Sequence, residues 1–374
     1  MRLELIATTT FGLEAVAKRE IQNLGYEIIK TEDGKITFWG DERAIVRCNL
    51  WLRTADRVLL KIDEFKATEF EDIFQRIKGY PWENIIPIDG KFTVTGTSVK
   101  SKLHSVPACQ STAKKAMVDR LSDVYAISQF EETGEEYKIK LTILKDRVTV
   151  TIDTSGPGLH KRGYRVCDVA APMKETLAAA LVQLSFYRPD RILVDPCCGS
   201  GTILIEAAMI AMGIAPGLNR KFVSEDWGLI DNAIWKEERK LAYEKINHDA
   251  KLDIKGYDID REAVLAAREN AIEAGVEDFV TFDVMNAKDL KRSGDRGIII
   301  TNPPYGERIG DQKGIFEIYR GFARFFEENK DWSLFLLTSD KEAEEQVTGR
   351  PADRRRKLYN GRIQVCYYQY YGEK

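Results

Sequence analysis

The sequence predicts an α/β fold for its carboxyl half, a mostly parallel sheet with helices on both faces, preceded by two smaller α+β units. Beyond residue 190, apolar strand patterns alternate with helical patterns, as in a parallel sheet covered by helices. Before residue 160, short strands and helices are mixed without this alternation. Between the two regions, the segment 153–160 contains two glycines and a proline, which predicts a domain boundary.

The composition is that of a folded chain with more than one domain. The chain has 374 residues, of which 44% are hydrophobic and 31% charged, so two or three domains are expected. No apolar run approaches the roughly 18 to 20 residues of a membrane span, and the start lacks the apolar run of a signal peptide. We therefore expect a cytoplasmic protein without membrane contact. A net charge of −3 excludes a globally basic nucleic-acid binder but allows a local basic face.

The amino half is expected to contain two α+β units, residues 1–62 and 63–155. Gly34 separates two short strands of the first unit as a turn. Neither unit carries an obvious catalytic motif. The expected elements are strands at 3–7, 26–29 and 35–39 with a helix at 13–24, then helices at 69–77 and 108–121 with strands at 91–99, 137–144 and 147–153.

The carboxyl half, residues 156–374, shows the alternating pattern. A charged, Trp-containing stretch from about 213 to 253 interrupts it and is interpreted as an insertion. A final hairpin, with strands near 357–359 and 363–370, predicts an antiparallel strand at one sheet edge. The other expected elements are strands at 191–195, 254–258, 280–284, 298–302 and 333–338 and helices at 202–212, 261–274 and 315–328.

The cysteines and histidines give no sign of a metal site. Six cysteines without a C-x-x-C pair and three histidines predict neither a disulfide framework nor bound zinc. The same scarcity leaves few candidates for a Ser-His-Asp triad. The sequence therefore predicts no metal.

The most informative local stretch is Ile-Leu-Val-Asp-Pro-Cys-Cys-Gly-Ser-Gly-Thr at 192–202. A buried strand ends at Asp195, Gly199 and Gly201 let the backbone approach a ligand closely, and a helix begins at once. The loop is nucleotide-sized. It is neither a G-x-G-x-x-G fingerprint nor a P-loop. A turn that merely packs strand on helix is the alternative.

Two further strands end in carboxylates. Asp258 closes the strand 254–258, where an acid is suited to accept ribose hydroxyls. Asp260 is interpreted as the cap of the next helix. Asp283 is suited to pair with an adenine amine, or else is a solvated turn residue.

The tetrapeptide Asn-Pro-Pro-Tyr at 302–305 follows an apolar strand. Two prolines fix the loop and remove amide donors, which leaves carbonyl acceptors. The oxygens of Asn302 and Pro303 can each accept a hydrogen of an exocyclic amine, while Tyr305 stacks on the base. This arrangement presents the amine to an electrophile bound next to it.

In their order along the chain, the three motifs D-P-C-C-G-S-G-T, G-Y-D-I-D and N-P-P-Y-G-E-R resemble class I S-adenosylmethionine-dependent methyltransferases that modify exocyclic amines of nucleic-acid bases. Residues 65–120 resemble a THUMP domain, an RNA-binding module. The whole chain is similar to bacterial 23S ribosomal RNA guanine-N2 methyltransferases. This resemblance implies a ferredoxin-like unit at 1–62, a THUMP domain at 63–155 and a Rossmann-like domain at 156–374, with seven strands of which one is reversed.

The resemblance also implies S-adenosylmethionine as cofactor and S-adenosylhomocysteine as product. The target base is expected to contact Asn302, Pro303, Pro304 and Tyr305. The segment 171–176 resembles the part that closes over the cofactor, although an ordinary helix start explains it nearly as well. The expected cofactor contacts are Asp195, Pro196, Cys198, Gly199, Ser200, Gly201, Thr202, Asp258, Ile259, Asp283, Val284, Pro172 and Lys174.

The implied partner is structured RNA, with 23S ribosomal RNA or a ribosome assembly intermediate preferred. Between residues 100 and 120 the chain has five basic residues and one acidic one, a composition suited to phosphates or to a solvated helix face. A second basic run at 353–362 is a further candidate for backbone contacts, whereas the tyrosines at 367–371 fit an edge strand better than a stacking surface. The expected RNA-binding residues are Lys100, Lys102, Lys114, Lys115, Arg120 and Arg162.

Other functions remain open at this point. Because the N-P-P-Y loop recognises an amine and not a whole base, a transfer-RNA guanine-N2 enzyme or an adenine-N6 enzyme would use the same motifs. A non-catalytic RNA-binding assembly factor with a retained fold is the alternative from another class. The intact loop argues against it.

Overall fold

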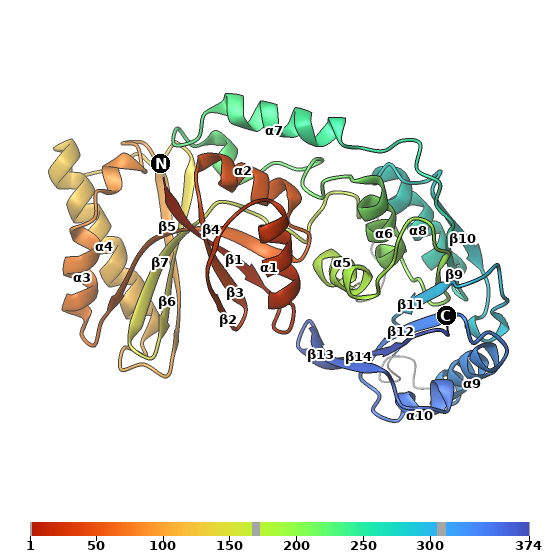
Figure 1. Cartoon of the computed structure of the whole chain (residues 1–374). Helices are drawn as coiled ribbons and strands as arrows, with labels where there is room; N and C mark the ends of the chain where they lie inside the picture. The colour runs from red at the N-terminus through yellow and green to blue at the C-terminus, as the bar shows by residue number, and fades with distance from the viewer. Residues whose placement is uncertain (1, 167–172, 305–311, 374) are drawn as a thin grey trace.

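The computed structural model describes residues 2–166, 173–304 and 312–373. Two lobes are each built on a sheet of seven strands within this part of the chain, and α7 (Asn232–Glu244) runs along the side that joins them (Figure 1). In the part of the chain described, no helix is long and apolar enough to cross a membrane.

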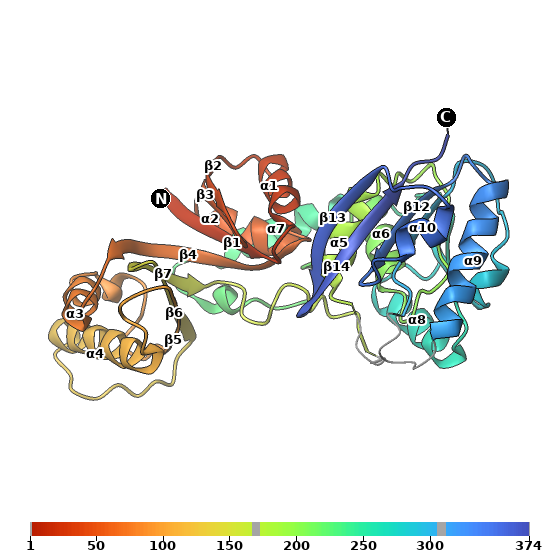
Figure 2. The same cartoon turned by 90° about the horizontal axis from the view of Figure 1, so that it is seen from below.

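The amino-terminal lobe has one continuous sheet, with strand order β2-β3-β1-β4-β7-β6-β5. The long strand β4 pairs with β1 and with β7, so the expected division at residue 62 falls inside this strand. The ferredoxin-like and THUMP units therefore share a sheet, as the extended β4 in Figure 2 shows. The elements are β1 (Leu3–Thr9), α1 (Glu14–Asn23), β2 (Ile28–Glu32), β3 (Lys35–Gly40), α2 (Glu42–Trp51), β4 (Ala55–Lys66), α3 (Phe70–Lys78), β5 (Lys91–Val99), α4 (Val106–Tyr125), β6 (Glu136–Leu144) and β7 (Arg147–Asp153).

The carboxyl-terminal sheet confirms the predicted parallel architecture. Its strand order is β10-β9-β8-β11-β12-β14-β13, in which β14 runs antiparallel to β12 and β13. The hairpin strand β13 forms the edge, whereas β14 is internal and buries Tyr367, Tyr368 and Tyr370. The elements are α5 (Glu175–Leu184), β8 (Leu193–Asp195), α6 (Thr202–Met212), β9 (Ile254–Asp258), α8 (Arg261–Glu273), β10 (Val280–Val284), β11 (Ile298–Thr301), α9 (Gln312–Glu328), β12 (Ser333–Thr338), α10 (Ala343–Thr348), β13 (Arg354–Asn360) and β14 (Ile363–Tyr370).

Apolar side chains fill both faces of this sheet. Helices α5, α6 and α8 pack on one face and α9 and α10 on the other. Strand β11 is buried along its whole length, which explains its unbroken run of apolar residues, because a central parallel strand has no solvated face.

The stretch 213–253, which was interpreted as an insertion, packs against the amino-terminal lobe. Phe222, Trp227 and Trp235 belong to the core of that lobe. Glu238 of α7 is buried and forms ion pairs with Arg43 and Arg47 of α2. Aromatic burial and charge pairing therefore join the two lobes.

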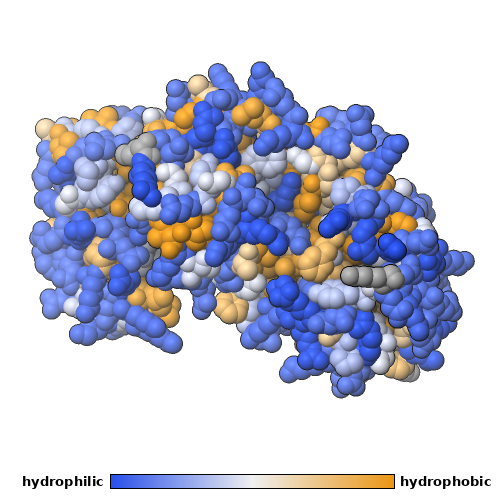
Figure 3. Space-filling model, viewed as in Figure 1, coloured by the Kyte–Doolittle hydropathy of each residue, from blue (hydrophilic) through white to orange (hydrophobic). Residues whose placement is uncertain are grey.

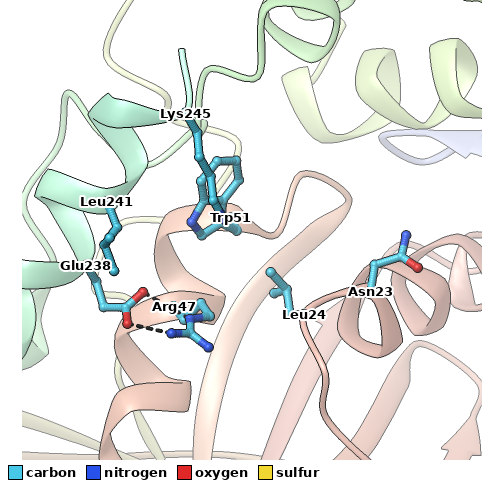
Figure 4. A pocket seen from close by; sticks show the side chains of 7 residues that line it. All are labelled: Asn23, Leu24, Arg47, Trp51, Glu238, Leu241 and Lys245. Atoms are coloured by element: carbon cyan, nitrogen blue, oxygen red, sulfur yellow. Dashed lines mark hydrogen bonds and ion pairs between the residues drawn. The ribbon is translucent and has the colours of Figure 1, made fainter. Parts of the chain in front are cut away.

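A hollow of about 230 Å³ opens beside these ion pairs (Figure 4). Lys245 lies over the ring of Trp51, with its nitrogen 4.9 Å from the ring centroid. The amide of Asn247 donates to the carbonyl of Met212, the last residue of α6. Since α6 begins at the glycine loop, this hollow lies at the opposite end of the helix. Its lining residues are Asn23, Leu24, Arg47, Trp51, Glu238, Leu241 and Lys245.

Candidate active site

The predicted residues of the glycine loop, the strand-end acids and the start of the N-P-P loop lie at the carboxyl ends of β8, β9, β10 and β11, which are neighbours in the sheet. In the strand register, Asp195 is the partner of Gly256 and Val284 is the partner of Asp258. Ligands of open α/β sheets bind at this edge. The structure therefore brings the glycine loop, the strand-end acids and the start of the N-P-P loop together.

The glycine loop 199–201 connects β8 to α6. Gly199 and Gly201 have φ values of +51° and +78°, which side chains rarely adopt. A Cβ on Gly201 would lie 2.8 Å from the ring of Phe282, whereas one on Gly199 would meet nothing within 4 Å. Gly201 is thus required by packing, and Gly199 leaves open space in which a ligand can approach the backbone.

Four other predicted contact residues of this loop have buried side chains: Pro196, Cys198, Ser200 and Thr202. The backbone amide of Cys198 donates to the carbonyl of Tyr257, and the carbonyl of Ser200 accepts from Asn270. These bonds fix the loop against β9 and α8. Its accessible contribution is therefore mainly backbone, together with the free amides at the start of α6.

Asp195 lies buried beneath the loop. Its Oδ1 accepts from the Thr301 hydroxyl at 2.7 Å and from the Cys197 amide at 3.1 Å. Burial raises the pKa of Asp195 to about 7, and the charge of Asp258 acts in the same direction. Asp195 thus ties the glycine loop to the strand that leads into Asn302.

Asp258 is half-buried and accepts two backbone hydrogen bonds, at Oδ2 from the Gly199 amide (2.9 Å) and at Oδ1 from the Asp260 amide (3.0 Å). The carboxylate is thereby oriented beside the open part of the loop. Asp260 caps α8 through the Glu262 amide, as predicted. Two apolar side chains stand exposed beside these acids, Ile259 at 69% and Val284 at 54%.

Asp283 is held by a neighbour that the sequence did not indicate. Arg268 donates to its Oδ1 at 3.0 Å and also to the carbonyl of Phe282. The Asp283 side chain is 65% exposed. The contact of Asp283 with the adenine amine stays a prediction. In that arrangement the carboxylate would accept hydrogen bonds from both Arg268 and the adenine amine.

Arg165 is a candidate site residue that the sequence analysis did not identify. It donates to Glu175, to the carbonyl of Met173 and to the hydroxyl of Thr202, the first residue of α6. Its Nη1 is buried and has no hydrogen-bond partner among the described residues. A buried guanidinium nitrogen at the positive end of a helix is suited to a carboxylate. The Gly-Tyr-Arg at 163–165 follows the segment 153–160 that was predicted as a domain boundary, and it gives no separate signal.

The segment before α5 is described only in part. Pro172 lies outside the described residues. Lys174 is the residue before α5, and its Nζ is 4.0 Å from Asp56 of the amino-terminal lobe. This contact directs Lys174 toward the lobe junction, and a role in cofactor binding remains a prediction.

The N-P-P loop continues directly from β11. Pro303 is buried, whereas Asn302 and Pro304 are half-buried. Tyr305 lies outside the described residues, so its predicted stacking role remains a prediction. Asn302 follows Thr301, whose hydroxyl is bonded to Asp195, and the loop therefore starts from a fixed point next to the glycine loop.

Arg162 was predicted to bind RNA, and the structure contradicts this prediction. Its side chain is 2% exposed and forms an ion pair with buried Glu206 of α6, and it also donates to the carbonyls of Leu159 and Arg53. Burial of a guanidinium requires such partners, and these place Arg162 in the lobe junction and not on an RNA-facing surface.

The other five predicted RNA-binding residues lie on the THUMP unit, and they differ in how free they are to contact RNA. Lys100, Lys102 and Lys115 are exposed. Arg120 pairs with Glu83 and Lys114 with Glu132, so these two cations are partly neutralised. The face of the molecule shown in Figure 3 is predominantly hydrophilic.

The residues present fit S-adenosylmethionine. Arg165 Nη1, which has no hydrogen-bond partner among the described residues, and the amides at the start of α6 would hold the amino-acid end. Asp258 would hold the ribose, and Ile259 and Val284 would pack on the flat adenine. Within the described residues, no three His, Cys, Asp or Glu side chains are grouped so that they could hold a metal ion.

Comparison with known proteins agrees with this geometry. A family model described as "RMKL-like, methyltransferase domain" matches residues 162–369, one described as "RlmL ferredoxin-like domain" matches 4–59, and a THUMP domain model matches 67–153. A Bacillus subtilis protein with the provisional name RNA methyltransferase YpsC is 50% identical over 371 residues, which are 99% of this chain and 96% of the relative.

Several solved structures are similar over the whole chain, and two of them are described here. One, from Listeria monocytogenes, is named a predicted N6-adenine-specific DNA methylase and has a TM-score of 0.95 at 46% identity, covering 100% of this chain and 97% of that one. The other, SMU.472 in complex with S-adenosylhomocysteine, has a TM-score of 0.94 at 44% identity and covers 100% and 99% of the two chains. The chain belongs to the RMKL-like methyltransferase family and is an S-adenosylmethionine-dependent methyltransferase that carries a THUMP domain.

Proposed function

We propose that this RNA methyltransferase transfers a methyl group to the exocyclic N2 amine of guanine in 23S ribosomal RNA, either free or in an assembly intermediate. The observation that carries the proposal is the position of Asn302, Pro303 and Pro304, which leave β11 at the same sheet edge as the glycine loop. The match of residues 4–59 to the RlmL ferredoxin-like model supports ribosomal RNA as the substrate. The name of the Bacillus subtilis relative supports RNA.

The chain's own residues bind and orient both reactants. S-adenosylmethionine supplies an activated methyl group, so no strong base is required. In the proposed mechanism, Asn302 and the Pro303 carbonyl accept hydrogen bonds from the two N–H groups of the amine and hold its nitrogen toward the methyl group. These hydrogen bonds strengthen as positive charge develops on the nitrogen, and they therefore stabilise the transition state more than the ground state. As the new N–C bond forms, the bond from the methyl carbon to sulfur breaks and S-adenosylhomocysteine leaves, and the nitrogen then releases one proton to solvent.

The hydrogen bond between Thr301 and Asp195 positions this loop. It fixes the residue before Asn302 to the strand that ends in the glycine loop. Positioning two reactants in this way lowers the barrier without a change in their chemistry.

An adenine-N6 activity is the second candidate, because the name of the Listeria relative specifies adenine and the loop recognises an amine and not a whole base. A guanine in transfer RNA is an alternative substrate for the same reason. The assignment to guanine N2 rests on the resemblance of the whole chain, including its first domain.

The test is nucleoside mass spectrometry on RNA from cells that lack the protein. We expect one N2-methylguanosine to be absent from 23S ribosomal RNA and to return with the wild-type gene but not with Asn302→Ala. Loss of N6-methyladenosine, or loss confined to transfer RNA, would contradict the substrate assignment and leave the methyltransferase activity standing.

A further inference from the structure

The tip of the β13–β14 hairpin meets the loop between β1 and α1, although about 345 residues separate them in the chain. The rings of Phe11 and Tyr359 lie edge to face, with centroids 5.8 Å apart at 72°. A Cβ on Gly12 would lie 2.8 Å from the carbonyl oxygen of Lys357. Figures 1 and 2 both show this hairpin reaching the base of α1.

The exposed groups at this contact combine aromatic rings with cations. Phe11 is 47% exposed, and the Lys357 nitrogen lies 5.8 Å from the centroid of the Tyr359 ring. Lys357 and Arg362 are exposed, and neither forms an ion pair with any residue that the structure describes. Elsewhere on the hairpin and just before it, Arg355 pairs with Glu344 and Arg350 with Asp353.

This surface lies at the catalytic edge of the sheet. Lys357 is the register partner of Cys366, which is the partner of Thr338 at the end of β12. Thr301 pairs with Leu336 of the same strand, so Lys357 and Asn302 lie toward the same edge. Three strand spacings separate β11 from β13, about 15 Å at ~4.8 Å each.

We propose that Phe11, Lys357, Tyr359 and Arg362 form a hairpin surface that binds the RNA strand next to the target nucleotide. Stacking rings interleaved with unpaired cations are the chemistry that binds single-stranded nucleic acid with little sequence preference. The exposed ring offers a face for a base, and the two cations attract phosphates. The inference rests on the proposed RNA substrate but not on which base is methylated.

RNA binding at the hairpin surface would give the amino-terminal unit a second role, besides its support of the THUMP fold. Phe11 comes from the first domain and the other three residues come from the methyltransferase domain. RNA bound here would contact both domains beside the active site.

The test uses the full chain and total RNA from cells lacking the protein, which contains the substrate whichever RNA it is. Lys357→Gln with Arg362→Gln should raise the apparent KM for RNA about tenfold and leave kcat at saturating RNA within about twofold. The slope of log affinity against log salt should fall by about 1.4, since each contact to single-stranded phosphate contributes ~0.7. A matched control is Arg188→Gln with Lys251→Gln, which removes one arginine and one lysine at the opposite edge of the sheet.

The aromatic part is tested separately. Phe11→Leu keeps an apolar side chain against Tyr359 but removes the stacking ring, and it should weaken RNA binding about tenfold, whereas Phe11→Tyr should bind like the wild type. Equal binding by Phe11→Leu and the wild type would remove the stacking role. An unchanged salt slope in the hairpin double variant would show that the surface is only a contact between domains. If the wild-type protein binds RNA but makes no N2-methylguanosine, the proposed function is wrong and the RNA-binding role of the hairpin surface still stands.

Discussion

The hydroxyl of Thr301 donates a 2.7 Å hydrogen bond to the buried carboxylate of Asp195. The two residues end adjacent strands, β11 and β8, and each is followed by a loop of the candidate site. The bond therefore couples the loop that is proposed to present the amine to the loop that is proposed to bind the cofactor. It also explains how a loop of prolines, which lacks amide donors of its own, keeps a fixed position.

Thr301→Val preserves shape and removes this hydrogen bond. Loss of one partner of a buried carboxylate costs about 1–3 kcal/mol of stability, and we expect kcat to fall roughly tenfold because Asn302 is less well positioned. Thr338→Val is the control, since Thr338 is equally buried at the end of the next strand. Single-turnover kinetics and thermal unfolding of both variants test this. Equal kcat in the two variants would show that the bond is only structural.

The pKa of Asp195 predicts a pH dependence of stability. Burial raises this pKa from 3.8 to about 7, so between about pH 4 and pH 7 the native state binds more protons than the unfolded state. Stability from this group therefore falls as pH rises through that window. Asp195→Asn should flatten the dependence, with a difference of roughly 2–4 kcal/mol across the window. Denaturant unfolding at several pH values measures it, and parallel curves for variant and wild type would contradict it.

Asp258→Ala removes both the expected ribose acceptor and the partner of the Gly199 amide. We expect affinity for S-adenosylmethionine to fall tenfold or more, since a hydrogen bond to a charged group contributes about 1.5–3 kcal/mol. Asp260→Ala is the control, because it removes only a helix cap and should cost about 1 kcal/mol of stability. Calorimetric titration of both variants with the cofactor measures the two affinities. If Asp258→Ala binds the cofactor as tightly as Asp260→Ala does, the role of Asp258 is refuted.

Asn302→Ala should lower the rate of methyl transfer about a hundredfold or more and leave cofactor affinity within a few-fold. The side-chain oxygen acts in the transition state and has no expected contact with the cofactor. Tyr305→Ala should mainly weaken binding of the target base, by roughly 1 to 3 kcal/mol. Single-turnover assays on RNA from cells lacking the protein measure both, and a normal rate in the Asn302 variant would refute the mechanism.

Removal of residues 1–160 should destabilise the methyltransferase domain. Two residues of the amino-terminal lobe, Leu13 just before α1 and Val16 of α1, belong to the core of that domain. Phe222 and Trp235 lose the core in which they are buried. We expect the truncated protein to aggregate or to unfold at a much lower temperature than the full chain. A cooperative thermal unfolding transition near that of the full chain would show that the methyltransferase domain is stable without packing against the amino-terminal lobe.

The sequence by itself determined the elements of the methyltransferase sheet. The bounds of β9, β10, β12 and α6 were predicted as observed, because periodicity and turn residues are local signals. The order of the glycine loop, the strand-end acids and the N-P-P loop was also sufficient to predict a shared edge, since parallel strands align their carboxyl ends. Two amino-half elements, α2 and β4, were missed, although Asp41 caps α2 with a 2.7 Å bond.

Only the tertiary structure decided which charged residues are paired in the core and which lie at the candidate site. Arg162 and Arg165 are three residues apart and similar in sequence context, yet one is paired with buried Glu206 and the other leaves a nitrogen free of described partners beside the glycine loop. The Phe11 and Tyr359 contact likewise joins distant segments. Local sequence patterns specify periodicity and turns, but the desolvation and pairing of a charge depend on neighbours that only the folded chain supplies.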